Sequence, residues 1–216
     1  VYMTPPAVAF VPPISPAAPK ATLVVIGIGF DGKMYESRNT LVRSTFYYHA
    51  AWTSPSASFG DQTFISAPAI TYACPPNAGS PSLVVVGQVN ANVFLANRLE
   101  NSSWVGWQTV NGLFHSGPAV ANGCTEFNSG ETTIYGRGLG DRVWAAVHVP
   151  GTTEGFCPIG NTVFSGTPSA MAPASGAQSV PSVLAGPSTA AARTAPEGPS
   201  ARASSCAVRV EPCRST

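Results

Sequence analysis

The stretch that decides the fold is NRLENSSWVGWQTVNGLFHSGPAVA, at residues 97–121. Its last part, SGPAV (116–120), has counterparts in SAPAI (66–70) and SGTPSA (165–170), so that one proline recurs every 50 residues. The segment PPAV (5–8) is a more divergent counterpart. A fixed period of this length is typical of repeat proteins. It predicts about three copies of one structural unit.

A second anchor is an apolar run that ends in glycine. It occurs as LVVIG (23–27), LVVVG (83–87) and TTIYG (132–136). Seven and eight residues after each glycine stand Met34-Tyr35, Phe94-Leu95 and Val143-Trp144. Between them lie Asp31-Gly32, Asn90-Ala91-Asn92 and Gly140-Asp141, residue types that tolerate positive φ. The pattern predicts tight hairpins that align the three copies.

Each copy is therefore predicted to contain four short strands. In the second copy we expect them at about 67–73, 82–88, 92–98 and 105–110. EGFCPI (154–159) aligns with VGWQTV (105–110), and TFYYHAAW (45–52) contains the matching strand of the first copy. Four strands in a repeat of this length predict an all-β fold of propeller-like blades. A β-sandwich with coincidentally similar strands is the alternative.

The predicted repeat region covers residues 1–171. Its copies lie at about 5–60, 61–111 and 112–164, with a stub at 165–171. Because a closed propeller needs about four blades or more, we expect a truncated chain, assembly into a homo-oligomer or an open array. Residues 172–216 form an Ala/Pro/Ser-rich tail, for which we expect disorder. A competing hypothesis is that this tail is translated out of frame.

Composition excludes several classes of function. The net charge is +1 and only 10% of residues are charged, so we expect no nucleic-acid binding. The longest apolar run, LVVIGIGF (23–30), is too short to span a membrane. Five cysteines occur without a C-x-x-C pair, so we expect no zinc site, and nothing suggests another metal or a cofactor.

The cysteines bear on location. Cys74 and Cys124 occupy equivalent positions, five residues after the anchor alanine. A disulfide between them, or from one of them to Cys157, is possible on sequence grounds, and such pairing favours an extracellular or secreted protein. No signal peptide is visible in the sequence.

With the repeat laid out, WVGWQTVNGLFHSGPAV (104–120) resembles the bacterial β-propeller lectins related to the Photorhabdus fucose-binding lectins. The resemblance covers residues from about 60 to 170, and it extends less closely over residues 5 to 60. Phe156 replaces Trp107 in the third copy, and the first copy lacks the W-x-G-W block. The resemblance implies monosaccharide binding in pockets between adjacent blades, by an aromatic face together with polar groups.

Four residues are predicted to bind ligand: Trp104, Asn97, Arg98 and His115. Trp104 has no aromatic equivalent in the third copy, although Trp52 is a possible counterpart in the first. Trp107 aligns with Phe156 and is therefore predicted to be a core residue. Arg98 has an equivalent in Arg38, for which a structural role is the alternative. His115 lies beside the SGPAV anchor, at a predicted connection between blades.

The predicted function is non-catalytic, lectin-like binding of a carbohydrate or glycoconjugate. A secreted propeller glycosidase of sialidase type, or its truncated remnant, is the alternative. A glycosidase needs two carboxylates at a controlled separation. No such pair is recognisable in the sequence, and no catalytic residue is assigned. A scaffold or surface protein without a small-molecule ligand is the third hypothesis.

Overall fold

The structure of the protein is a computed structural model. It describes residues 2–11, 20–43, 48–54, 56, 59–73, 82–89, 93–100, 103–110, 112–122, 132–149, 152–153, 155–171 and 182–185. Over these residues the regular structure consists of β-strands and one short 3-10 turn, η2 (Leu139–Asp141). The predicted all-β class is therefore confirmed. The predicted turn at Asn90-Ala91-Asn92 and most of the tail lie outside the described residues.

The first two sheets repeat one antiparallel pattern. The first sheet has the order β1-β2-β3-β4, with the strands at Ala7–Val11, Lys20–Ile28, Met34–Arg43 and Tyr48–Trp52. In the second sheet, β5 (Ala69–Ala73), β6 (Ser82–Gln88) and β7 (Phe94–Glu100) are followed by β8 (Ser103–Trp104) and β9 (Gln108–Val110). Both β8 and β9 pair with β7, so two short strands take the place of one fourth strand, and of these β9 lies within the predicted range 105–110.

The third sheet repeats this pattern and the fourth begins it. The third contains β10 (Ala119–Asn122), β11 (Thr132–Arg137), β12 (Arg142–Val149), β13 (Thr152–Thr153) and β14 (Cys157–Val163). The fourth contains β15 (Pro168–Met171) and β16 (Ser182–Ala185). β16 lies inside the segment for which we expected disorder, and it pairs with β15 over four residues.

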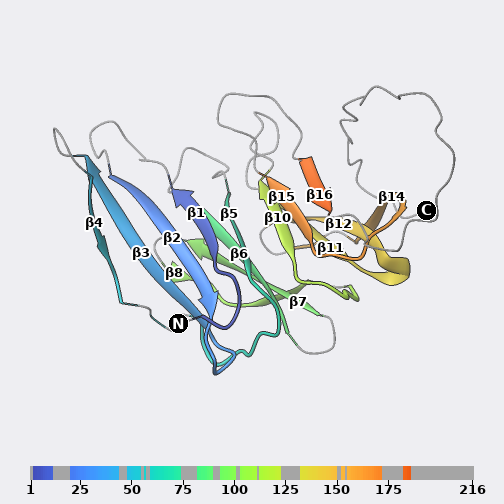
Figure 1. The fold of residues 1–216 in the computed structure, drawn as a ribbon, viewed down its shortest axis with the longest axis horizontal. Helices are drawn as coiled ribbons and strands as arrows, with labels where there is room; N and C mark the ends of the chain where they lie inside the picture. The colour runs from blue at the N-terminus through green and yellow to red at the C-terminus, as the bar shows by residue number, and fades with distance from the viewer. Residues whose placement is uncertain are drawn as a thin grey trace, which may run out of the picture.

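We call the four sheets blades 1 to 4 in chain order. Figure 1 shows them following one another across the molecule, from the blue blade 1 to the orange strands of blade 4. The first strands of successive blades, β1, β5, β10 and β15, contact one another in that order. This succession agrees with the propeller-like repeat that the sequence predicts.

The register of the hairpins confirms the alignment of the copies. Gly27 pairs with Tyr35, Gly87 with Leu95 and Gly136 with Trp144, as the spacing predicts. The predicted turn residues have the expected backbone, with a φ of 76° at Gly32 and 56° at Asp141. The third hairpin is therefore closed by a left-handed turn like the first, although its sequence differs.

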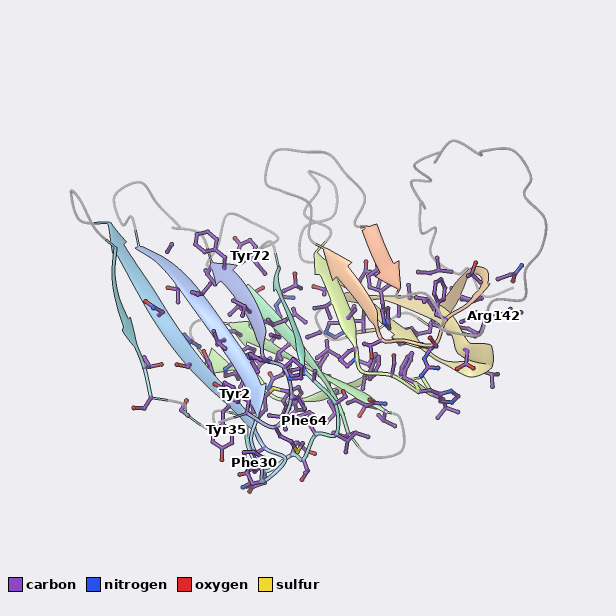
Figure 2. All side chains as sticks on the ribbon, in the orientation of Figure 1. Tyr2, Phe30, Tyr35, Phe64, Tyr72 and Arg142 are labelled. Carbon is purple, nitrogen blue, oxygen red and sulfur yellow. The ribbon has the colours of Figure 1, made fainter. Side chains whose placement is uncertain are left out.

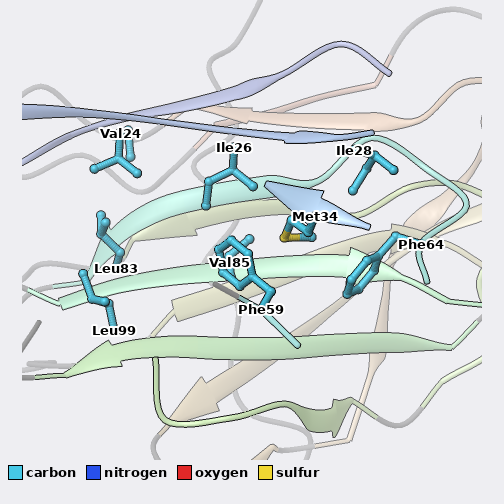
Figure 3. Close-up of a cluster of buried hydrophobic side chains, with 10 residues drawn as sticks. Val24, Ile26, Ile28, Met34, Phe59, Phe64, Leu83, Val85 and Leu99 are labelled. Carbon is cyan, nitrogen blue, oxygen red and sulfur yellow. The ribbon is translucent and has the colours of Figure 1, made fainter. Parts of the chain in front are cut away.

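The core lies between the blades. β6 is buried along its whole length, because its two faces pack against different neighbours. Leu83 and Val85 join Val24, Ile26 and Met34 of blade 1 in one cluster (Figure 3). Val84 and Val86 join Phe114, Val120 and Ile134 in a second cluster, toward blade 3. A near-continuous apolar strand is thus explained by burial on both faces.

An aromatic residue caps the anchor glycine of each of the first three blades. The rings of Tyr2, Phe64 and Phe114 lie where a Cβ atom would stand on Gly27, Gly87 and Gly136, respectively. Phe64 and Phe114 each precede an anchor proline by four residues, a spacing that Phe164 repeats before Pro168. We call Tyr2, Phe64 and Phe114 the capping aromatics. The F-x-x-x-P pattern was visible in the sequence, but our sequence analysis missed it.

Candidate functional site at the blade junctions

The junction between blades 1 and 2 holds a polar group made by residues from both blades. The indole Nε1 of Trp104, on β8, donates a hydrogen bond of 2.8 Å to Oε2 of Glu36, on β3. Glu36 is only 4% exposed, and its other oxygen, Oε1, accepts from Nε of Arg38. A buried carboxylate is costly unless donors satisfy it, so the indole and the guanidinium together stabilise Glu36 in this position.

Strand geometry explains why Glu36 and Arg38 act together. They stand two residues apart on β3, opposite Ile26 and Val24, whose side chains belong to the core cluster between blades 1 and 2. Residues two apart share a face of the sheet, so both side chains turn toward blade 2. The Arg38 side chain is 32% exposed, so it remains partly accessible to solvent while its Nε binds the carboxylate.

Aromatic rings complete this junction. Phe59 lies beside Trp104, with ring centroids 4.6 Å apart, and beside Trp107, with centroids 5.8 Å apart. Trp107 also contacts Phe64 and donates from Nε1 to the carbonyl oxygen of Phe59. Phe156 contacts Phe114 at the next junction, with centroids 4.6 Å apart. The predicted core position of Trp107 therefore agrees with its packing and with that of its aligned partner.

Asn97 stabilises the backbone turn between Trp104 and Trp107. Its side chain is buried, and Oδ1 accepts a hydrogen bond of 3.0 Å from the backbone N–H of Gly106. Gly106 has a φ of 112°, a conformation that strongly favours glycine. Asn97 therefore fixes the turn between Trp104 and Trp107, and its side-chain oxygen already accepts a hydrogen bond.

Arg98 faces the opposite junction. It pairs with Val84, as Arg38 pairs with Val24, which confirms that the two arginines are equivalent. Because Val84 belongs to the cluster toward blade 3, Arg98 turns away from Trp104. Nε of Arg98 lies 3.3 Å from Oε1 of Glu100, which is close enough for an ion pair, but it makes no hydrogen bond. The attraction between these two side chains is therefore mainly electrostatic.

His148 of blade 3 lies close enough to Arg98 for its charge to matter. Burial lowers the pKa of His148 below its ordinary value, and the positive charge of Arg98 lowers it further. The unfolded chain therefore binds a proton more readily than the folded one. The stability that the neutral His148 side chain contributes is therefore fully present above its unfolded pKa of about 6.5. It is lost as the pH falls from there through the folded pKa.

We expect the melting temperature to fall as the pH is lowered from 7.5 to 5.5, and we expect this fall to be smaller in His148→Gln. Melting curves of both proteins across this range test the prediction. His115→Gln is the matched control, because His115 is exposed. An equal pH dependence in the wild type and in His148→Gln would contradict this assignment.

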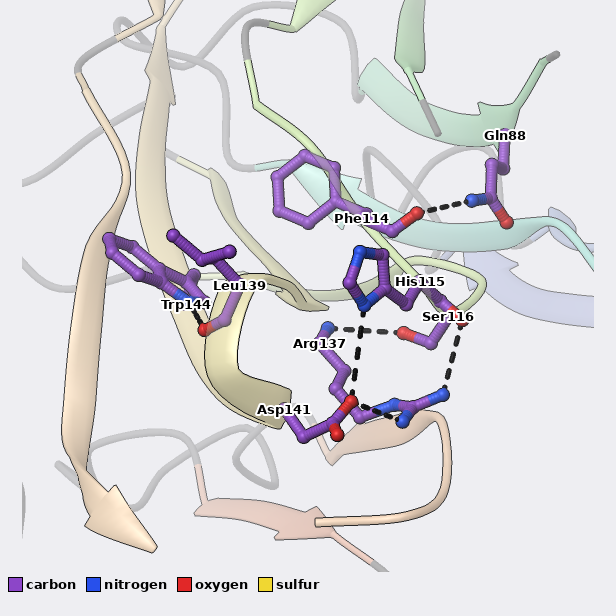
Figure 4. Close-up of polar contacts among 8 residues, drawn as sticks. All are labelled: Gln88, Phe114, His115, Ser116, Arg137, Leu139, Asp141 and Trp144. Atoms are coloured by element: carbon purple, nitrogen blue, oxygen red, sulfur yellow. Dashed lines mark hydrogen bonds and ion pairs between the residues drawn. The ribbon is translucent and has the colours of Figure 1, made fainter. Parts of the chain in front are cut away.

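His115 belongs to a third polar group, shown in Figure 4. Its Nδ1 lies 3.9 Å from Oδ1 of Asp141, and this oxygen accepts a hydrogen bond of 2.7 Å from Nη1 of Arg137. Nη2 of Arg137 donates to the carbonyl oxygen of His115, and the backbone N–H of Arg137 donates to Oγ of Ser116. Nε2 of Gln88, in blade 2, donates a hydrogen bond to the carbonyl oxygen of Phe114 and so links this segment to blade 2. The group thus fixes the start of blade 3.

The structure does not bring the four predicted residues into one site. Trp104 and Asn97 contribute to the junction of blades 1 and 2, Arg98 faces blade 3, and His115 contacts the turn of blade 3. The backbone of Trp52 pairs with Asn39 as Trp104 pairs with Leu99, so the proposed equivalence of Trp52 agrees with the register. Glu36 is the residue that sequence reasoning missed. Its position two residues before Arg38, on one face of a strand, was the available signal.

Comparison with protein-family models gave no match, and no curated protein matches the chain. Among the described residues, no group of three or more His, Cys, Asp or Glu is placed to hold a metal ion. Within the same residues there is no helix long and apolar enough to cross a membrane. Cys157 is disulfide-bonded, and the other four cysteines lie outside the described residues.

Proposed function

We propose that the protein is a non-catalytic carbohydrate-binding protein and that the junction of blades 1 and 2 binds the sugar. The observation that carries this proposal is the group formed by Trp104, Glu36 and Arg38, which joins two blades and in which the Arg38 side chain is still partly exposed. At this junction an aromatic ring and a charged pair from two blades occur together. The resemblance to propeller lectins implies binding between adjacent blades, which is compatible with this junction.

The chemistry of a sugar suits this group. A monosaccharide has an apolar C–H face, which stacks on an indole, and hydroxyls, which both donate and accept hydrogen bonds. The guanidinium N–H groups of Arg38 that do not bind Glu36 are donors, and the buried Glu36 fixes the orientation of the guanidinium and of the indole. Because the two charges offset each other, the site favours a neutral sugar over an acidic one.

The described carboxylates favour binding over catalysis. Each of the five is engaged by a partner: Asp31 by Tyr35, Glu36 by Arg38, Asp61 by Lys33, Glu100 by Arg98 and Asp141 by Arg137. A glycosidase keeps one carboxyl group as an acid and a second as a base or nucleophile. Hydrogen bonds from Tyr35 and Lys33 lower the pKa of Asp31 and of Asp61, respectively, which makes both poorly suited to the acid role. The disulfide at Cys157 supports an extracellular location.

Arg38→Met is expected to weaken sugar binding about tenfold or more, because a hydrogen bond to a charged group contributes about 1.5–3 kcal/mol. A glycan array first identifies the sugar, and titration followed by tryptophan fluorescence then compares the variants. Arg142→Met is the matched control. Arg142 is also a partly exposed arginine, at the start of β12, and its substitution should leave the affinity unchanged.

Three results would count against the proposal. Absence of binding to every glycan at millimolar sugar, by a chain that melts cooperatively, would favour a scaffold protein without a sugar ligand. Hydrolysis of aryl glycosides that is lost in Glu36→Gln would favour the glycosidase alternative. Equal loss of affinity in the two arginine variants would remove the junction of blades 1 and 2 as the site.

A further inference from the structure

Blade 1 carries an apolar face on the side away from blade 2. Val8 and Phe10 of β1 are 53% and 52% exposed. They pair with Val25 and Leu23 of β2, so the four side chains share one face of the sheet. None of them is charged. An apolar group of this kind on a sheet face is typical of a surface that binds another protein element.

The same positions in blade 2 are covered. Ile70 and Tyr72 pair with Val85 and Leu83, as Val8 and Phe10 pair with Val25 and Leu23. All four of these blade 2 residues belong to the cluster that packs against blade 1, where Leu83 and Val85 are fully buried. The exposed face of blade 1 is therefore, position by position, the face that receives a neighbouring blade in blade 2.

The capping aromatics show the same difference. Phe64 covers Gly87 and is 1% exposed, because Met34 of blade 1 and Trp107 close over it. Tyr2 covers Gly27 in the same way but stays partly exposed. Figure 2 shows Tyr2 and Phe64 at the same end of their blades. Blade 1 therefore has the same kind of apolar surface and capping aromatic as blade 2, but no described blade lies against them.

We propose that this face docks a second copy of the chain, through the sheet of β15 and β16. Blades 1 to 3 each have the next blade against their other face, whereas β15 and β16 are followed by no further described sheet. Docking them on blade 1 of another copy repeats the head-to-tail contact that joins blades within the chain. The net charge of +1 opposes association only weakly.

The self-association of Phe10→Asp tests this contact. Analytical ultracentrifugation of the full chain should show a dimer or larger ring for the wild type. The variant, which introduces a charge into the contact, should dissociate at least ten times more readily. Val105→Asp is the matched control, because Val105 is equally exposed at 53% but lies between β8 and β9 of blade 2. Melting curves confirm that both variants are folded.

Hydrogen exchange of the wild type at high and low concentration tests which sheet docks. Backbone amides of β1, β15 and β16 should exchange more slowly at high concentration. A wild type that stays monomeric up to millimolar concentration, or equal weakening by Phe10→Asp and Val105→Asp, would overturn the proposal. Added protection in β1 without any in β15 and β16 would overturn the assignment of the docking sheet.

Discussion

Phe114→Ala is expected to lower the free energy of unfolding by about 3–5 kcal/mol, the usual loss when a fully buried phenylalanine is truncated. Phe114 is 1% exposed and lies where the chain passes from blade 2 to blade 3. Its ring stacks on Phe94, with centroids 3.9 Å apart and planes 6° apart, and contacts the edge of Phe156. It also covers Gly136. Truncation therefore leaves a cavity that touches both blades.

Denaturant unfolding measures this loss, and Phe30→Ala is its control. Phe30 lies at the turn after β2 and is 76% exposed, so its truncation should change the free energy of unfolding by no more than about 0.5 kcal/mol. A loss below about 1 kcal/mol for Phe114→Ala would mean that the ring is not part of a closely packed junction. Losses of equal size in the two variants would contradict the assignment of Phe114 to the core.

The second large effect is expected at an anchor glycine. Gly87→Ala places a methyl group too close to the edge of the Phe64 ring and 3.0 Å from the Met34 side chain of blade 1. Overpacking of this kind destabilises a protein by about 1–3 kcal/mol. Since alanine otherwise suits a strand better than glycine does, a net loss of stability demonstrates the clash.

Gly155→Ala is the matched control for this substitution. A Cβ at Gly155 would have no heavy atom within 4 Å, so its stability should stay the same or rise slightly. Adding Phe64→Leu to Gly87→Ala makes room for the methyl group. The double variant should therefore lose less than the sum of the two single losses, which a double-mutant cycle measures. Additive losses would show that the ring and the glycine are not in contact.

Much of the fold could be predicted because its signals are local. The runs before Gly27, Gly87 and Gly136 predicted strands, and the spacing to Tyr35, Leu95 and Trp144 predicted equivalent hairpins, which the observed register confirms. The core position of Trp107 followed from its alignment with Phe156. Strand alternation, turn residues and repeat period all depend on residues close in the chain, so a single sequence carries them.

The candidate site was less predictable for a physical reason. Trp104 was expected to bind ligand, but its partner Glu36 stands 68 residues away on another blade. Asn97 and Arg98 were predicted to act together, yet neighbouring residues of a strand point to opposite faces, and each reached a different junction. Which side chains meet across a junction depends on how two sheets pack, and no periodicity records that.

The sequence by itself determined the all-β class, the repeat and the hairpin register, because strand pairing within a blade follows from patterns of about ten residues. Only the tertiary structure decided that Glu36 and Arg38 join Trp104 and that an aromatic caps each of the first three anchor glycines. It also decided that blade 1 presents an open apolar face. These features depend on how separate strands and sheets pack against one another, which no local sequence pattern records.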